Sequence, residues 1–265
     1  MLKTLLAHPL TRGLDIDDPA TTELRTRIIR QKRFLRRIYD EWYAMITARL
    51  PAGPGPVLEL GSGAGFLDEV IPGLITSEVF RLPSVRLVLD GQQLPFGPRV
   101  LRGIVMCDVF HHLPDTPSFL SEAARCTRPG GVVVMIEPWV TPFSKLIYTR
   151  LHHEPFRTRA VEWTLPKGGP LSNANGALPW ICFERDRTRF DRAFPAWQVE
   201  EVHPFMPFRY LVSGGVSMRS LMPGFSFGLW RGIEQCLQPW MKTWAMFALI
   251  VLRRASCSEA APVGG

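Results

Sequence analysis

The segment at residues 57–66 constrains the fold of this chain more than any other. Two apolar residues, Val57 and Leu58, lead to Glu59, and glycine then occupies the alternate positions 61, 63 and 65. This pattern predicts a buried strand that turns sharply into a helix, because glycine adopts unusual backbone angles and lets a ligand touch the main chain. The N–H groups at the start of the following helix would suit an anionic group.

Two kinds of nucleotide-binding fold use such a turn. The nicotinamide fingerprint needs G-x-G-x-x-G, but here the third glycine comes one residue early and Phe66 stands in its place. The E-x-G-x-G-x-G arrangement resembles motif I of class I S-adenosylmethionine (SAM)-dependent methyltransferases. The resemblance implies that Glu59 lies near the amino group of SAM. The residues that would hold the methionine part are Gly61, Ser62, Gly63 and Gly65. A plain glycine-rich turn is the alternative reading.

Three later segments follow in the order of the same family. Residues 85–96 resemble its third strand, residues 103–113 its fourth strand and the exit from it, and residues 132–138 its fifth strand. With motif I they cover roughly residues 54–140, about a third of the chain. The residues that the resemblance places at the cofactor are Asp90, Gly91 and Gln92 beside the adenine, and Asp108 and Val109 at the exit of the fourth strand.

The second strand departs from the family pattern. It normally ends in an acidic residue that holds the ribose hydroxyls, and the best candidate is Glu78. Only residues 80–84 then precede the third strand, whereas a parallel crossover normally needs a dozen residues or more. Either this connection is a bare loop, or residues 86–90 form the second strand and Asp90 holds the ribose. We prefer Glu78, because Asp90 precedes the Leu-Pro-Phe run of the third-strand segment.

Three residues are candidates for moving a proton. Methylation of oxygen or nitrogen is an in-line displacement, in which positioning supplies much of the rate and a base helps if the acceptor starts protonated. His111 and His112 follow the fourth strand and Glu137 ends the fifth, so we expect them beside the methyl group. Alternatively, the histidines pack or touch SAM and Glu137 caps a helix or loop. No metal is predicted, because the His-His-Glu run at residues 152–154 lacks the usual metal-site spacing.

Residues 1–50 are predicted to contain a basic amphipathic helix ahead of the cofactor-binding core at residues 51–140. Asp18-Pro19 is typical of a helix start, and apolar side chains recur at helical spacing. Residues 21–40 contain seven Arg or Lys residues and only two acidic ones. The helix is a solvated face, or a lid that places a cation near the SAM carboxylate, or a docking surface for an anionic membrane or nucleic acid. The aromatic residues that would close over the ligands are Tyr39, Trp42 and Tyr43.

Two long connections in the second half predict a cap over the methyl group. About 58 residues separate the fifth strand from the next strand candidate at residues 197–202, and about 40 more precede a last strand that starts at Trp244. Both leave from the edge where ligands bind in this fold, and both exceed normal loop length. We therefore assign residues 141–196 to one cap insertion, and a second one to the end of the sheet at residues 197–254. Their many aromatic residues indicate a bulky, partly hydrophobic acceptor.

Composition narrows the setting. The 265 residues, 46% of them hydrophobic, fit one α/β domain with elaborations. The five scattered cysteines include no C-x-x-C pair, which is typical of reduced thiols in the cytoplasm. The longest apolar stretch, residues 244–252, is far short of the ~20 residues of a membrane span, and no signal peptide is apparent at the start. Residues 255–265 are predicted to be disordered.

Together these patterns predict an α/β fold: a Rossmann-like, mostly parallel seven-stranded sheet with helices on both faces. The resemblance implies a cytoplasmic enzyme that moves a methyl group from SAM to an oxygen, or less readily a nitrogen or carbon, of a small molecule. Nucleic acid is disfavoured as a partner, because no RNA-binding motif or separate basic domain accompanies the helix. The alternatives are methylation of a lipid or macromolecule docked through the basic helix, and a non-catalytic SAM-fold partner protein. The oligomeric state is left open.

Overall fold

The computed structural model describes residues 8, 10 and 14–256, except 153, 167 and 170. Most of the tail predicted to be disordered, residues 257–265, lies outside the described residues, as does His153 of the His-His-Glu run. Of residues 1–50, those numbered 1–7, 9 and 11–13 are likewise outside.

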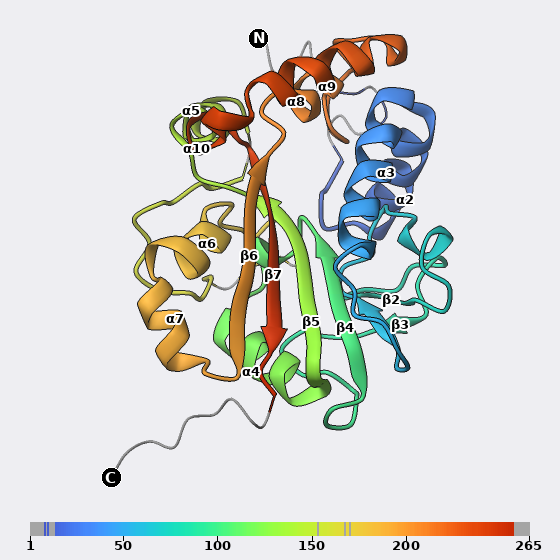
Figure 1. Ribbon diagram of the computed structural model, residues 1–265. Coiled ribbons are helices and arrows are strands. Elements are labelled where there is room, and N and C mark those ends of the chain that lie inside the picture. Colours follow the sequence, from blue (N-terminus) through green and yellow to red (C-terminus); the bar gives the residue numbers. More distant parts are fainter. Residues whose placement is uncertain are drawn as a thin grey trace.

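A single mixed sheet organises the chain (Figure 1). The strands are β1 Val57–Glu59, β2 Ile75–Glu78, β3 Leu87–Val88, β4 Leu101–Cys107, β5 Thr127–Pro138, β6 Trp197–Phe205 and β7 Phe247–Arg254. They lie in the order β3-β2-β1-β4-β5-β7-β6, and β7 alone runs antiparallel to both of its neighbours. The central strands read as continuous apolar runs because both faces of the sheet are covered. The predicted seven-stranded, mostly parallel fold is confirmed.

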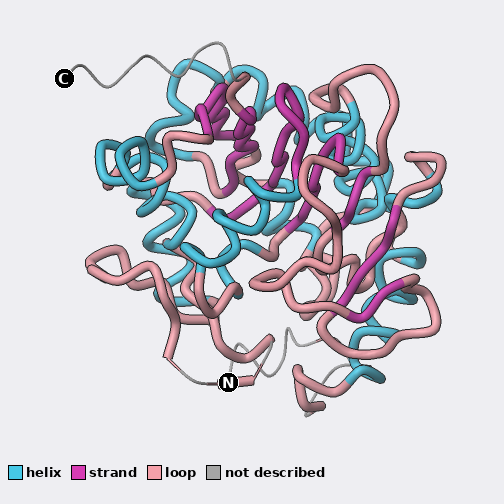
Figure 2. Tube along the Cα trace, turned by 90° about the horizontal axis from the view of Figure 1, so that it is seen from below, coloured by secondary structure: helices cyan, strands magenta, loops and turns pink. Residues whose placement is uncertain are grey.

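Helices cover both faces of this sheet, as the view along the strands shows (Figure 2). One face carries α4 Thr116–Cys126, α6 Leu178–Trp180, a π-helical turn Ile181–Arg185 and α7 Arg187–Ala193. Residues 178–193, which we had assigned to the first cap insertion, therefore lie against the sheet instead of over its edge. The opposite face is covered by the N-terminal helix α3 Arg33–Thr47, whose apolar side chains join those of β4, β5 and β7 in one core.

The expected helix after the glycine-rich turn is absent. Residues 60–74, all of them described, contain only the short 3₁₀ turn Leu67–Glu69 between β1 and β2. The glycine-rich turn uses the first half of this connection, and Pro72 interrupts the second, so a full helix has no room. A bare loop also joins β2 to β3. This is the first of the two alternatives given above, in which the second strand ends at Glu78. Because these helices are missing, α3 packs where they would cover the sheet, against Phe66, Leu67 and Ile71.

The N-terminal helix is broken into two, where a single helix was expected. Helix α2 Pro19–Gln31 begins at the predicted cap, where the Asp18 carboxylate accepts a hydrogen bond from Ala20 N at 2.8 Å. The break falls at Lys32, whose backbone is extended, and α3 starts directly after it. Lys32 Nζ donates to the carbonyls of Ser213 and Gly215 at 3.2 and 2.7 Å, and to that of Met218. The break thus ties the two helices to the second cap segment.

The cap helices gather at the carboxyl ends of the parallel strands (Figure 1). They are α5 Pro142–Leu151, α8 Arg209–Ser213, α9 Phe227–Cys236 and α10 Met241–Trp244. Because α10 takes up Trp244, the last strand starts three residues later than expected, at Phe247. The caps and the N-terminal helices therefore enclose one edge of the sheet from above.

Candidate active site

One cavity of about 690 Å³ lies at the carboxyl ends of β1, β2 and β4. Its walls come from the cofactor-binding core, from α2 and α3, and from both cap segments. All eleven predicted cofactor-binding residues line it: Glu59, Gly61, Ser62, Gly63, Gly65, Glu78, Asp90, Gly91, Gln92, Asp108 and Val109. A smaller, open hollow of about 360 Å³ near Arg185 and Asp186 contains none of the predicted site residues.

The glycine-rich turn needs glycine at its first two glycine positions. Gly61 has φ +65° and Gly63 φ +49°, in the left-handed region that side chains avoid. A Cβ on Gly61 would lie 2.6 Å from Cγ2 of Val109, so the turn and the exit of β4 are in direct contact. Ser62 N donates to Ser77 O at 2.8 Å, which anchors the turn to β2.

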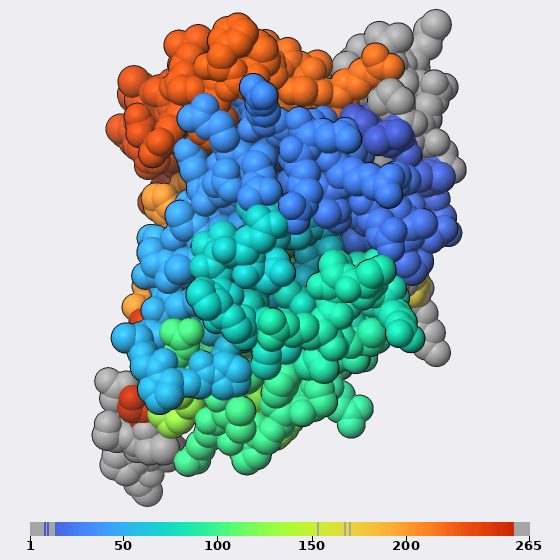
Figure 3. Space-filling view, turned by 90° about the vertical axis from the view of Figure 1, so that its right-hand side faces the viewer, coloured from blue at the N-terminus to red at the C-terminus, as the bar shows by residue number. Residues whose placement is uncertain are grey.

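Helix α3 closes the end of the turn. The hydroxyl oxygen of Tyr43 accepts a hydrogen bond from Phe66 N at 3.1 Å, and a Cβ on Gly65 would lie 2.6 Å from this oxygen. Of the three aromatic residues expected to close over the ligands, Tyr39 and Tyr43 line the cavity. Trp42 instead stacks on Tyr210 in the core, with ring centroids 5.6 Å apart. In Figure 3 the N-terminal helices, in blue, lie between the orange cap segment at the top and the teal part of the core below.

The cavity is rich in carboxylates whose charge is poorly compensated. Burial raises the pKa of Glu59 to about 7 and also raises the pKa of Glu78. Burial likewise raises the pKa of Asp108 to about 7, and this side chain is exposed where it lines the cavity. Arg25 is the one Arg or Lys among the described residues that line the cavity. The site therefore favours a ligand that carries positive charge.

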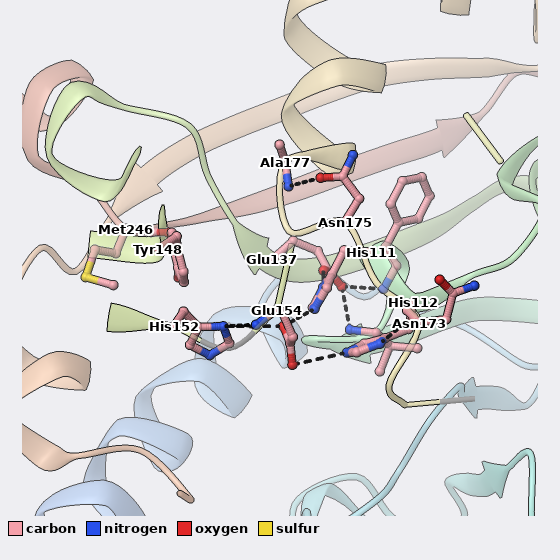
Figure 4. A network of polar contacts seen from close by, with 12 residues as sticks. His111, His112, Glu137, Tyr148, His152, Glu154, Asn173, Asn175, Ala177 and Met246 are labelled. Atoms are coloured by element: carbon pink, nitrogen blue, oxygen red, sulfur yellow. Dashed lines mark hydrogen bonds and ion pairs between the residues drawn. The ribbon is translucent and has the colours of Figure 1, made fainter. Parts of the chain in front are cut away.

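Beneath the cavity, Glu137 holds the exit of β4 in place (Figure 4). Its carboxylate is fully buried and accepts hydrogen bonds from Val109 N at 2.8 Å, Phe110 N at 2.7 Å and His111 Nδ1 at 2.7 Å. Burial alone would lower the pKa of His111, but its contacts with Glu137 and Glu154 outweigh burial and raise it well above the usual value. Neither Glu137 nor His111 lines the cavity. The expectation that they face the reacting methyl group as bases is not met by this geometry.

His112 is the predicted catalytic residue that does line the cavity. Its Nδ1 lies 3.1 Å from the carbonyl oxygen of Asn173, and its ring lies 4.2 Å from that of His111. Burial, reinforced by the positive charge of His111, lowers the pKa of His112 to about 3. The imidazole is therefore neutral near pH 7, with a proton on Nδ1, because a carbonyl oxygen can only accept.

The matched family agrees with this geometry. Residues 58–135 match the family model described as "Methyltransferase domain", a segment that starts in β1 and ends in β5. Residues 58–135 thus form a methyltransferase domain, and the fold is that of a SAM-dependent methyltransferase. SAM is accordingly the cofactor of this methyltransferase. No curated protein sequence matches the chain.

Solved structures share the fold of this methyltransferase at low sequence identity. A chain from the complex of the Haloferax volcanii Trm112 methyltransferase activator with a methyltransferase is 13% identical, with a TM-score of 0.53; the match covers 92% of this chain and 99% of that one. Geranyl diphosphate C-methyltransferase from Streptomyces coelicolor A3(2) is 12% identical, with a TM-score of 0.49 and coverage of 94% and 89%. The first of these matches shows a shared fold, and its identity of 13% leaves the acceptor open.

Sequence reasoning did not single out two residues of the site, Arg25 and Glu154. Arg25 is one of seven basic residues in its segment, and nothing in the spacing distinguishes it. Glu154 was considered with its sequence neighbours, whereas in the structure it faces His111 and His112, which lie more than forty residues earlier. Only the tertiary contact between the first cap segment and the exit of β4 reveals this grouping (Figure 4).

The basic face of the N-terminal helices is largely engaged within the protein. Arg30 and Arg36 pair with Glu69, and the guanidinium of Arg37 lies 4.1 Å from the ring centroid of Phe227. Arg25 lines the cavity and Lys32 binds cap carbonyls. Four of the seven basic residues thus hold the lid to the rest of the methyltransferase, and Arg25 faces the cavity, which weakens the interpretation of a docking surface. Among the described residues, no helix has both the length and the apolar character that crossing a bilayer requires.

Proposed function

We propose that this methyltransferase transfers the methyl group of SAM to an oxygen atom of a bulky, partly hydrophobic small molecule. The observation that carries the proposal is the shared cavity, in which the glycine-rich turn meets apolar side chains of the lid and caps. These are Ile16, Tyr39, Leu171, Tyr210 and Val216. Its volume of about 690 Å³ falls within the roughly 300–1,000 Å³ of small-molecule sites. Of the aromatic residues in the caps, Tyr210 faces the cavity, while most others pack in the core.

Charge complementarity supports the placement of SAM. Its ammonium group would lie at Glu59, and its carboxylate at Arg25, the basic residue on the lid. Glu78 would bind the ribose hydroxyls, because it is the last residue of β2, which pairs with β3. Asp90 would then bind the adenine, together with Gly91 and Gln92. The positive sulfonium would then lie near Asp108, at the exit of β4.

In the proposed reaction the acceptor oxygen attacks the methyl carbon of SAM. A C–O bond forms as the S–C bond breaks, and the sulfur keeps the electron pair, leaving S-adenosylhomocysteine. His112 faces the cavity, but its low pKa suits it to hydrogen bonding and not to proton removal at neutral pH. Asp108, with a pKa near 7 and a carboxylate exposed to the cavity, is the better acceptor for the proton of the substrate hydroxyl.

Calorimetric titration with SAM and with S-adenosylhomocysteine tests the cofactor site. The informative variant is Gly63→Val, which places a branched side chain in the cavity 3.5 Å or less from the Glu78 carboxylate. Gly73→Val is the matched control, because Gly73 also has a positive φ, of +75°, but has no neighbouring atom within 4 Å and lies outside the cavity. We expect SAM binding to be lost in the first variant and kept in the second. Unchanged SAM affinity in a folded Gly63→Val protein would contradict the proposal.

A second candidate is an acceptor held in a membrane. Exposed apolar side chains recur along the outer face of α9 and beside it: Phe225 is 89% exposed, Leu229 68% and Trp240 56%. Cosedimentation with phosphatidylcholine vesicles would detect such docking, and the double variant Phe225→Ser/Leu229→Ser should abolish it. Val161→Ser, at a 70% exposed site elsewhere, is the control. Equal sedimentation of all three proteins would exclude this surface.

A further inference from the structure

Three possible metal ligands converge between the β4 exit and the first cap segment (Figure 4). Oxygens of Glu154 lie 3.4 Å from His111 Nε2 and 3.9 Å from His112 Nε2. One ligand atom from each of the three residues lies within 4.8 Å of the other two. Two imidazoles and a carboxylate form a ligand set that holds divalent transition metals in catalytic sites.

Both imidazoles are oriented as metal ligands. His111 Nδ1 lies 2.7 Å from the Glu137 carboxylate, and His112 Nδ1 lies 3.1 Å from the carbonyl oxygen of Asn173. An acceptor on Nδ1 keeps a proton there, so Nε2 is the nitrogen that can bind a metal ion. At His111, whose raised pKa favours a second proton on Nε2, the ion would displace that proton. Both Nε2 atoms point toward Glu154, and metal-binding histidines characteristically have such an outer acceptor. Glu137 is itself held by two backbone N–H groups, so this outer layer is rigid.

The spacing suits a metal ion better than a direct hydrogen bond. A charged hydrogen bond between nitrogen and a carboxylate is about 2.7–2.9 Å long, shorter than the 3.4 Å observed. Ligand bonds of about 2.1 Å arranged as a tetrahedron put neighbouring ligand atoms about 3.4 Å apart. His111 Nε2 is fully buried, and its partner among the described residues is the Glu154 carboxylate, at the separation that a shared metal ion would give.

We propose that His111, His112 and Glu154 bind one divalent transition-metal ion, with Zn²⁺ as the best match. His112 and Glu154 line the cavity, so the remaining coordination position would face the acceptor. This inference rests on the proposed function: an ion held by these residues would lower the pKa of the acceptor hydroxyl, and Asp108 would accept the released proton. The acceptor oxygen would then form the C–O bond while the S–C bond breaks. The substrate class is thereby narrowed to molecules whose reacting group is a metal-binding hydroxyl.

Calorimetric titration of the full chain with Zn²⁺, and with Co²⁺ followed by visible absorption, tests the site. The variants His112→Gln and Glu154→Gln each remove one ligand, while His203→Gln on β6 removes a histidine outside the cluster. We expect one ion per chain, an affinity loss of at least about 100-fold in the first two variants, and none in the control. The Co²⁺ spectrum should show tetrahedral or five-coordinate nitrogen and oxygen ligands.

Two outcomes would overturn the inference: no binding of Zn²⁺ or Co²⁺ to the wild-type chain, or binding that survives both ligand variants. Titration of the same samples with SAM separates this inference from the proposed function. SAM binding without metal binding would refute the metal site alone. Metal binding without SAM binding would leave the site intact and refute the proposed methyl transfer. Where both bind, removing the ion with a chelator should abolish methyl transfer while leaving SAM affinity unchanged.

Discussion

Replacing Glu59 with glutamine should make the unliganded methyltransferase more stable at alkaline pH while weakening SAM binding. Burial raises the pKa of Glu59 from 4.5 to about 7. The folded state therefore holds this proton more tightly than the unfolded state, and raising the pH through this range favours unfolding. The difference between the two pKa values corresponds to about 3 kcal/mol, lost between pH 4.5 and about pH 7. Glutamine at this position cannot ionise, so the variant does not lose this free energy of unfolding as the pH rises.

Urea unfolding of both proteins at pH 5 and pH 8 measures this effect. The advantage of Glu59→Gln over wild type, in free energy of unfolding, should be about 2.5 kcal/mol larger at pH 8 than at pH 5, because part of the loss has already occurred at pH 5. Glu69→Gln is the control without a pH effect in this range. Arg30 and Arg36 outweigh a small burial effect and lower the pKa of Glu69, so its titration changes stability below pH 4.5, and the difference between this variant and wild type should be nearly the same at pH 5 and pH 8. A Glu59→Gln advantage that does not change with pH would refute the reasoning.

At pH 8, calorimetry should show the opposite effect on the cofactor. Loss of the charged contact to the ammonium group should weaken SAM binding by roughly tenfold or more, since a hydrogen bond to a charged group contributes about 1.5–3 kcal/mol. Unchanged SAM affinity would mean that Glu59 does not contact the cofactor.

Three further predictions concern the turn, the cavity charge and the lid. Gly61→Ala should destabilise the protein by about 1–2 kcal/mol or more and weaken SAM binding, whereas Gly232→Ala in α9, with open space around it, should stabilise it by about 1 kcal/mol; thermal unfolding compares the two. A cationic ligand favours the ionised forms of Glu59 and Asp108, so SAM binding should release protons from them, and SAM affinity should fall about tenfold per pH unit below pH 7 for each proton released. A SAM affinity that calorimetry finds to be independent of pH would contradict this. Burial lowers the pKa of Lys32 to about 8, so the stability of wild type relative to Lys32→Met should rise between pH 8 and pH 10. If urea unfolding shows that this relative free energy of unfolding falls over the same range, the lowered pKa of Lys32 is refuted.

Local patterns were sufficient for the strands and for the turn that carries Glu59. An apolar run that ends in a carboxylate and alternate glycines describes contacts among near neighbours, and those contacts recur in the structure at Gly61 and Gly63. The pairing of β2 with β3 also follows the preferred assignment, with Glu78 at the end of β2. Whether Glu78 binds the ribose remains a prediction.

The helices around this core were predicted less well. The sequence suggested a helix after the turn because such a helix usually follows, but the connection to β2 is too short to hold one. Helix α3 covers this face of the sheet instead, and its position depends on packing between segments that are distant in sequence. The break at Lys32 has the same origin, since three carbonyls of the second cap segment surround its ammonium group.

By itself, the sequence determined which segments form the strands, where the glycine-rich turn lies and which residues end β1, β2 and β4, because each rests on interactions within a few residues. The tertiary structure decided which of these side chains face the cavity. It buried His111 and Glu137 beneath the wall, turned Asp108 and His112 into the cavity, and brought Glu154 to the histidines from the far side. These placements follow from how the caps and the N-terminal helices pack on the sheet, and packing between distant segments leaves no periodic signal along the chain.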